Sequence, residues 1–196
     1  MLTNLVKMLK FNRNNANSLR GQRLVTIYFQ FDRKKAIETI LYLAKNVSDS
    51  DVYGICKLLY LVDKTSLEKY GRFVFGETYC AMKAGATPSK AYNLLKEAVE
   101  TNIDGISRDG DLVVATRDAN TDYLSESDIE CLDQIISIWG KAPNWSRGNA
   151  AHDEAWEHAW TNRGDKESIE IPVINIAELF DDSDDLIGYL SNSFSE

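Results

Sequence analysis

Apolar residues recur every three or four positions over two long stretches in the first half of the chain, which predicts two amphipathic helices. The first helix is expected to begin after Asp32, as its N-cap, and to run to about Lys45. The second is expected from about 51 to 70, where Ser48-x-x-Asp51 resembles a capping box and Gly71 supplies the stop. Their apolar positions are Ala36, Ile37, Ile40, Leu41 and Ala44, then Val52, Ile55, Leu58, Leu59 and Val62.

The same periodicity predicts three helices further along. Thr87-Pro88 is expected to give an N-cap followed by proline at the first helical position. Ser125-x-x-Asp128 predicts a helix through about Trp139, and a last core helix is expected over 150–162. The helix after Pro88 is expected to bury Ala91, Tyr92, Leu94, Leu95, Ala98 and Val99.

Strand signals are fewer. Residues 103–116 place Asp109-Gly110 between two β-prone runs, which predicts a hairpin. Residues 169–176 favour a strand, and the acidic stretch 180–196 is expected to be mobile around an apolar island at 186–190. The expected fold class is mainly α (α+β): a compact helical domain with a small β-hairpin, an N-terminal basic arm and a C-terminal acidic tail.

Composition places the chain among ordinary soluble proteins. Of 196 residues, 44% are hydrophobic and 27% charged, and the longest apolar runs are far below the roughly 20 residues of a membrane span. The N-terminus lacks the apolar region of a secretory signal. We therefore expect a cytoplasmic protein with no membrane contact.

Charge is distributed unevenly along the chain. The formal net charge is −8, yet residues 1–24 carry five basic residues and no acid, whereas residues 165–196 carry nine acids and one lysine. Because phosphate contacts need basic surface, this balance leaves only residues 1–24 as a candidate nucleic-acid contact. The same arm also fits a short amphipathic helix, a contact with an acidic partner, or a solvated extension.

No metal or cofactor site is expected. Cys56, Cys80 and Cys131 have neither metal-ligand nor disulfide spacing, and indicate core or half-buried thiols. His152 and His158 lie about 240° apart around a helix, so they cannot share a ligand face. Aromatic packing is the preferred interpretation, with an alanine series that lets the helix dock closely. The members are His152, Trp156 and Trp160, with Ala151, Ala155 and Ala159.

Catalytic motifs are equally sparse. Gly71-x-x-x-x-Gly76 has the glycine spacing of a phosphate-binding loop, but Glu77 stands where the lysine belongs, so the glycines are expected to make turns. The sequence holds no nucleophile elbow, paired-carboxylate motif or dinucleotide fingerprint. A Cys–His–Asp site assembled only by the fold stays open as an alternative, but we do not expect an enzyme.

A set of motif residues recurs in order along the chain. It comprises Lys57-Leu58-Leu59-Tyr60, Tyr70-Gly71-Arg72, Gly76, Tyr79, Ala81, Gly85 and Pro88, then the helix in 123–140, then His152 and Trp156. This pattern resembles the SocA-like antitoxin (Panacea) domain family, which also occurs in phage-associated GepA-like proteins. The resemblance covers about 31–162, which implies a domain there, a basic extension over 1–30 and an acidic extension over 163–196. Ala86, Thr87 and Ala151 depart from the family pattern.

The resemblance implies an antitoxin that neutralises a cognate toxin protein by direct binding. It implies that the shared residues are structural or lie at an interface: turn glycines, helix starts, and an aromatic core of Tyr60, Tyr79, Tyr92 and Trp156. The acidic chain would favour a basic toxin. The alternatives are a phage or mobile-element protein that inhibits a host protein or acts as a host-protease adaptor, an enzyme, and a nucleic-acid regulator.

Overall fold

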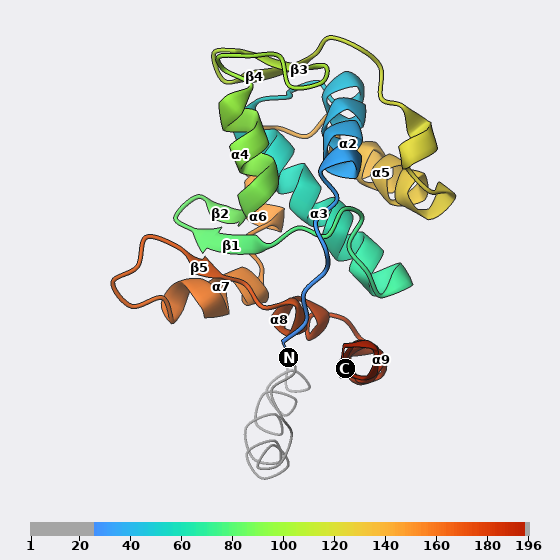
Figure 1. The fold of residues 1–196 in the computed structure, drawn as a ribbon. Helices are drawn as coiled ribbons and strands as arrows, with labels where there is room; N and C mark the ends of the chain where they lie inside the picture. The colour runs from blue at the N-terminus through green and yellow to red at the C-terminus, as the bar shows by residue number, and fades with distance from the viewer. Residues whose placement is uncertain (1–25, 195–196) are drawn as a thin grey trace.

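The computed structural model describes residues 26–194 and is shown in Figure 1. The predictions made for the basic arm, residues 1–24, lie outside the described residues. The helices are α2 (Arg33–Asn46), α3 (Val52–Tyr70), α4 (Ser89–Glu97), α5 (Glu126–Trp139), α6 (Asn144–Ala150), α7 (Glu154–Thr161), α8 (Val173–Ala177) and α9 (Ser183–Ser193), with a 3-10 turn η1 (Thr121–Tyr123). The strands are β1 (Tyr79–Met82), β2 (Gly85–Pro88), β3 (Ile106–Asp109), β4 (Leu112–Ala115) and β5 (Ile169–Glu170).

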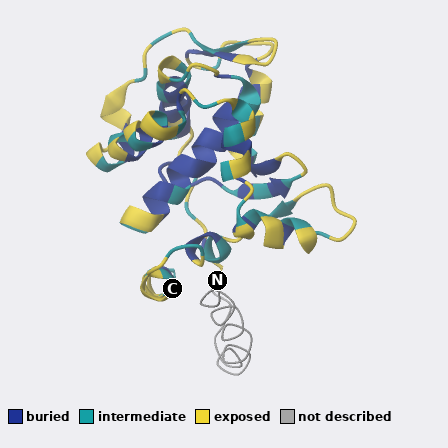
Figure 2. Ribbon diagram, turned by 180° about the vertical axis from the view of Figure 1, so that it is seen from behind, coloured by how far each residue is buried: buried dark blue, intermediate teal, exposed yellow. Residues whose placement is uncertain are grey.

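Helix α3 is the centre of the molecule. Thirteen of its 19 residues are buried, and Figure 2 shows it as a dark band through the middle of the fold. Helices α2, α4, α5, α6 and α8 all pack against it. A helix that is apolar on most sides must be covered on most sides, so α3 organises the core.

The strands form two small antiparallel sheets. One has the order β2-β1-β5, with Tyr79 opposite Pro88 and Cys80 opposite Glu170. Strand β2 packs on α3, while β1 packs on α7, so this sheet lies between the two helices (Figure 1). The other sheet is the β3–β4 hairpin, at the opposite end of the molecule from α9. The expected fold class, mainly α with minor β structure, is confirmed.

Several helix ends follow the sequence signals. The Asp32 carboxylate accepts a hydrogen bond from the Lys35 N–H (3.0 Å) at the start of α2. Ser125 and Asp128 form the predicted capping box of α5. Gly71 ends α3 in the left-handed conformation at φ 64°, which costs an L side chain strain that glycine avoids.

Other predicted ends are wrong. Asp51, not Ser48, caps α3 through the Gly54 N–H, whereas the Ser48 hydroxyl donates to the carbonyl of Gly140. Thr87 lies in β2 rather than at a helix cap, and α4 begins one residue after Pro88. Val99, expected to be buried, is 58% exposed because the helix has already ended.

The C-terminal third differs most from expectation. The helix expected over 150–162 is broken into α6 and α7, because the Asp153 carboxylate caps a new helix by accepting from the Trp156 N–H. Only Ile169–Glu170 of the expected strand is extended, since Pro172 has no N–H and α8 follows it. The acidic stretch expected to be mobile contains α9, whose Leu190 is fully buried. None of the helices in the described part of the chain is long and apolar enough to cross a membrane.

Candidate functional site

The Lys57 side chain is buried against the β1–β2 sheet. Only 1% of Lys57 is exposed, and its ammonium donates to the Ala86 carbonyl (2.8 Å) and lies 5.0 Å from the centre of the Tyr53 ring. Burial lowers the pKa of Lys57 to about 8. The ammonium therefore ties α3 to β2 through a backbone carbonyl and an aromatic face.

Gly85 meets both Lys57 and His152. Its φ is 101°, and a Cβ there would lie 2.5 Å from His152 ring atoms and 3.0 Å from the Lys57 ammonium nitrogen. Both the backbone conformation and the available space exclude a side chain. The structure thus brings together three motif residues that are far apart in the sequence.

Tyr60 forms a second tie, from α3 to the start of α7. Its hydroxyl contacts both carboxylate oxygens of Asp153, at 3.1 and 2.9 Å, and the Lys64 ammonium reaches the same carboxylate at 2.6 Å. Burial, reinforced by the Asp153 charge, raises the pKa of Tyr60 well above its usual value. Asp153 thereby fixes the position of α7 as well as capping it.

Tyr79 connects β1 to a buried carboxyl group. Its hydroxyl lies 2.8 Å from Asp63 and 2.9 Å from the carbonyl oxygen of Leu59, and the Val74 N–H donates to Asp63 at 2.7 Å. Burial raises the pKa of Asp63 to about 7. Tyr79 also packs edge-on against Tyr60, with ring centres 5.1 Å apart.

A row of π systems follows α7. His152 stacks on Trp156 at 4.2 Å between ring centres, Trp156 stacks on Trp160 at 6.0 Å, and the Arg163 guanidinium lies 3.6 Å from the centre of the Trp160 ring. The Trp156 indole N–H donates to the Met82 carbonyl (3.0 Å). The predicted alignment is therefore present, although His152 precedes α7.

The row lies at the margin of the core, and Trp156 and Trp160 pack against it. Ala151, Ala155 and Ala159 are buried, as expected for close docking, but Trp156 is only half-buried and His152 is exposed. Tyr92 is also half-buried, with the Lys96 ammonium over its ring at 4.8 Å. Tyr60 and Tyr79 are buried in the core as predicted, whereas Tyr92 and Trp156 pack against it and remain partly exposed.

The remaining motif residues lie away from this cluster. Tyr70 donates to Glu130 on α5 (2.6 Å), and a Cβ at Gly71 would lie 2.8 Å from the Tyr189 ring on α9. Gly76, at φ 69°, lets the chain pass close to the Gln30 carbonyl. These residues join α3 and the loop after it to their neighbours. Ala81 and Pro88 are buried in β1 and β2.

Glu77 caps the N-terminus of α4, a role that the sequence did not reveal. Its buried carboxylate accepts from the N–H groups of Thr78 (2.7 Å), Lys90 (3.1 Å) and Ala91 (2.7 Å). These amides include the N-terminus of α4, where negative charge is favourable. The protein's own carboxylate thus occupies the helix end that a phosphate would need, and Gly76 makes a turn as predicted.

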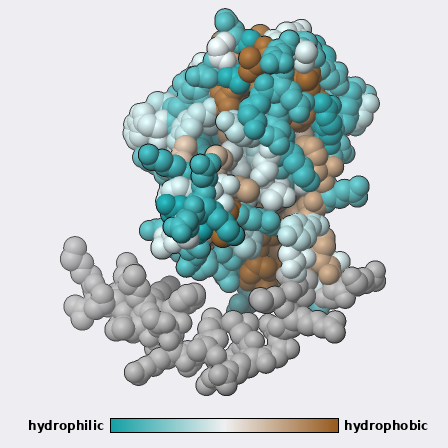
Figure 3. Space-filling view, turned by 60° about the vertical axis from the view of Figure 1, so that its left-hand side comes forward, coloured by the Kyte–Doolittle hydropathy of each residue, from teal (hydrophilic) through white to brown (hydrophobic). Residues whose placement is uncertain are grey.

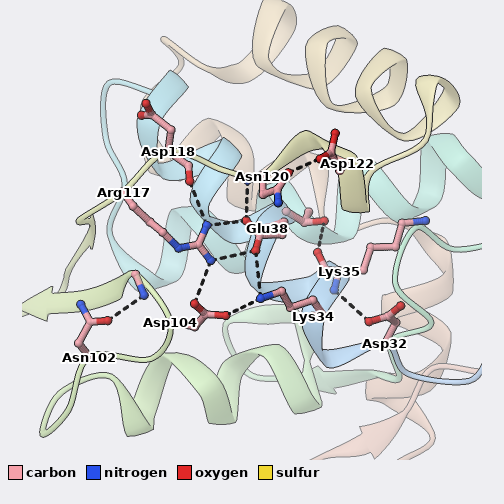
Figure 4. A network of polar contacts seen from close by, with 12 residues as sticks. Asp32, Lys34, Lys35, Glu38, Asn102, Asp104, Arg117, Asp118, Asn120 and Asp122 are labelled. Carbon is pink, nitrogen blue, oxygen red and sulfur yellow. Dashed lines mark hydrogen bonds and ion pairs between the residues drawn. The ribbon is translucent and has the colours of Figure 1, made fainter.

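Three further charged side chains are buried, which the sequence did not indicate. Glu38 is fully buried on α2, where both guanidinium nitrogens of Arg117 reach it at 2.8 Å, as Figure 4 shows. The Asp128 carboxylate forms ion pairs with Lys35 (2.5 Å) and Arg72 (2.8 Å). The third, Arg147, is described below. Glu38 stands directly beside the apolar positions of α2, which was the only signal available.

The contacts of the cluster are made within the fold. Within residues 26–194, no group of His, Cys, Asp and Glu could hold a metal ion. The hollow lined by Phe29, Phe73, Tyr79 and Ile171 has a volume of about 10 Å³, the space of one water molecule. Cys56 and Cys131 are buried and Cys80 is half-buried, as expected. The clustered side chains connect α3, the β1–β2 sheet and α7 into one unit.

Comparison with known proteins gives one match. The family model described as "Antitoxin SocA-like, Panacea domain" matches residues 55–157, which is more than half of the chain. The matched segment begins within α3 and ends within α7, so it contains the whole Lys57–Gly85–His152 cluster. No curated protein and no solved structure matches the chain. The resemblance drawn from the sequence motifs is confirmed.

Proposed function

We propose, from the premise that this chain belongs to the antitoxin SocA-like Panacea domain family, that it is an antitoxin that binds and neutralises a cognate toxin protein. The observation that carries the proposal is the family match over residues 55–157. The toxin would be held stoichiometrically in the cytoplasm, and the antitoxin would perform no chemistry of its own.

The arrangement of polar groups supports a binding role. The ionisable side chains of the motif cluster contact backbone groups, aromatic rings or one another. Groups engaged in this way hold the fold in one shape, and a rigid shape binds a partner with a smaller loss of conformational entropy. The net charge of −8 favours a partner with a basic surface.

The test is capture followed by neutralisation. The tagged chain is used to isolate proteins from its native host at about 150 mM salt, where charges further apart than about 8 Å are screened. A captured protein that stops growth when expressed alone, and is harmless when co-expressed with this chain, supports the proposal. Inhibition that reaches completion at a fixed molar ratio supports stoichiometric binding rather than catalysis.

The contrary outcomes are equally definite. If the captured protein is a host enzyme or protease without toxicity, the antitoxin assignment is wrong. The chain then inhibits a host protein or acts as an adaptor for a host protease. If growth arrest by the captured protein persists during co-expression, capture has no neutralising effect and the proposal fails. A chain carrying Gly85→Asp, which the structure cannot accommodate, serves as the misfolded control.

A further inference from the structure

Trp145 is the most exposed of the large apolar side chains in the described part of the chain. It is the second residue of α6, and 69% of it is accessible to solvent. It takes no part in the stacked row on α7. Tryptophan is enriched at protein interfaces, where its indole supplies a large apolar contact area, so the surroundings of an exposed tryptophan are of interest.

Three segments meet at the start of α6, one residue before Trp145. The Asn144 side-chain amide donates to the Asp51 carboxylate at 2.6 Å, which connects α6 to the start of α3. Asp51 in turn forms a β-bridge with Leu112, and the Val52 N–H donates to the Asp111 carbonyl (2.9 Å). These contacts place the β3–β4 hairpin loop next to α6. We name this surface the α6 end face, with members Asp49, Asp51, Asp109, Asp111, Leu112 and Trp145.

Arg147 connects the segments that form the α6 end face. It is fully buried and donates to the carbonyls of Trp139 (3.0 Å), Gly140 (3.0 Å) and Asp49 and to the Asn144 side chain (2.9 Å). The oxygens that accept from it are neutral and lie at the end of α5, in the loop before α3 and on α6, and the charges of Asp49 and Asp51 lie close enough to favour the guanidinium. The guanidinium therefore fixes the loops around Trp145 before any partner arrives.

Glycines let the helices beneath this face approach closely. A Cβ at Gly148 would overlap the Tyr53 hydroxyl, and one at Gly54 would overlap the Asn144 side chain. The N-terminal turns of α3 and α6 are consequently in direct contact. Trp145 thus projects from a rigid base, although it lies at the end of a short helix.

The charge around Trp145 is mainly negative. Asp49, Asp109 and Asp111 are exposed, and the Asp111 side chain is 92% accessible. The neighbouring cation Arg108 is 12% accessible and pairs with Asp111 at 3.0 Å. Lys141 is the exposed cation of the segment before α6. Solvent therefore meets carboxylates beside an exposed indole and the exposed Leu112.

Hydropathy agrees with this picture. Figure 3 shows a largely hydrophilic face with apolar side chains in small groups, one of them near the end where Figure 1 places β3 and β4. Leu112, 45% exposed, belongs to that hairpin. Apolar anchors surrounded by polar groups are the arrangement of protein-binding surfaces.

We propose that the α6 end face is the docking surface for a basic protein partner, which receives the Trp145 indole in an apolar pocket and pairs its cations with Asp49, Asp109 and Asp111. The assignment rests on the proposed antitoxin function, since the partner is the toxin. Trp145 is the anchor, and Arg147 positions the surface without touching the partner.

The experiment compares Trp145→Ala with the wild-type full-length chain, using the toxin identified by capture. Because an interface anchor contributes at least about 2 kcal/mol, we expect Kd to rise by about 30-fold or more, with an unchanged melting temperature. Tyr28→Ala is the matched control: Tyr28 is 57% exposed and lines the hollow beside Glu170, Ile171 and Val173, none of which belongs to the α6 end face. That variant should bind like wild type.

The outcomes separate the two proposals. A wild-type chain that binds and neutralises the toxin, together with a Trp145→Ala variant of equal affinity, overturns the docking surface and leaves the antitoxin function intact. A wild-type chain that neutralises no captured protein contradicts the function itself. Hydrogen exchange adds a check: the complex should protect amides in 109–113 and 141–147, and protection confined to α9 would place the interface elsewhere.

Discussion

Lys57, Asp63, Glu77 and Arg147 bury ionisable groups against backbone carbonyls, backbone amides or a tyrosine hydroxyl. Such partners satisfy the hydrogen-bonding capacity of a buried group through directed dipoles, which offsets part of the cost of removing it from water. The arrangement demands close geometry, because each donor or acceptor must be in place. These buried side chains therefore contribute to the fold mainly by fixing the positions of the backbone groups that they bind.

Asp63 should make stability depend on pH. Its folded pKa of about 7 lies above its ordinary value of 3.8, so the folded state binds the proton more tightly than the unfolded chain does. The stabilisation is fully present below about pH 4 and is lost as pH rises to about 7. The free energy of unfolding should therefore fall by up to about 4 kcal/mol between pH 4 and pH 7, and Asp63→Asn should abolish this fall.

The asparagine is compatible with the site. Its carbonyl can accept from the Val74 N–H, its amide can donate to Tyr79, and the Tyr79 hydroxyl can donate to the Leu59 carbonyl. Urea unfolding of both proteins between pH 4 and 8 measures the effect. Parallel curves of unfolding free energy against pH would show that Asp63 does not titrate in this window.

Gly85 should be intolerant of any side chain. Gly85→Ala adds strain at φ 101° and a clash with His152 and Lys57, so we expect a loss of about 3 kcal/mol. Gly110→Ala is the control, since φ there is 61° and nothing lies within 4 Å of the added Cβ. That variant should lose about 1 kcal/mol. Equal losses in chemical denaturation would mean that the packing around Gly85 contributes nothing.

At the level of elements, helix ends are fixed by whichever group reaches them, near or distant in sequence. Asp32 and Ser125 cap their own helices and were recognisable. Helix α4 takes its cap from Glu77, eleven residues before Pro88, and Asp153 breaks one expected helix into two. A cap from an adjacent residue can be predicted from local sequence spacing. A cap from a distant residue depends on the tertiary fold, because the β1–β2 hairpin must first return the chain to the neighbourhood of that residue.

Glu77→Gln tests the distant cap. The amide retains one acceptor oxygen but turns an N–H₂ group towards the N–H donors of α4, so we expect a loss of about 2 kcal/mol. Glu97→Gln, at the exposed C-terminal end of the same helix, should change stability by less than about 0.5 kcal/mol. Thermal and urea unfolding provide the comparison. A Glu77→Gln chain as stable as wild type would contradict the capping role.

At the level of the whole molecule, α3 joins the motif cluster at one side to the α6 end face at its N-terminal turn. The family match covers the motif cluster and the part of the α6 end face that lies on the hairpin and α6, whereas Asp49 and Asp51 precede it. Helix α9, with Asp181, Asp182, Asp184 and Asp185 around its start, also lies outside the match. The acidic surface therefore extends beyond the matched domain. Its charge acts over distance and favours encounter with a basic partner.

Added salt should slow association with the toxin, because it screens the long-range attraction between the acidic surface and a basic partner. With a net charge of −8, association with a basic toxin should slow by about tenfold between 50 and 500 mM salt, because the Debye length shortens from about 14 to 4 Å. Stopped-flow measurement of the association rate gives the effect. Trp145→Ala should instead raise the dissociation rate. An association rate independent of salt would rule out steering by the acidic surface.

The sequence by itself determined the mainly helical class, the positions of α2, α3 and α5, and the family, because apolar periodicity and adjacent caps are properties of neighbouring residues. It could not place His152 against Gly85, give Glu77 to α4 or bring the Asp49 carbonyl to Arg147. Those contacts join residues separated by many positions, and only the packing of α3 against the sheet and α6 brings them within bonding distance. Tertiary structure alone also decided which aromatic residues of a helical stripe face the core and which remain at the surface.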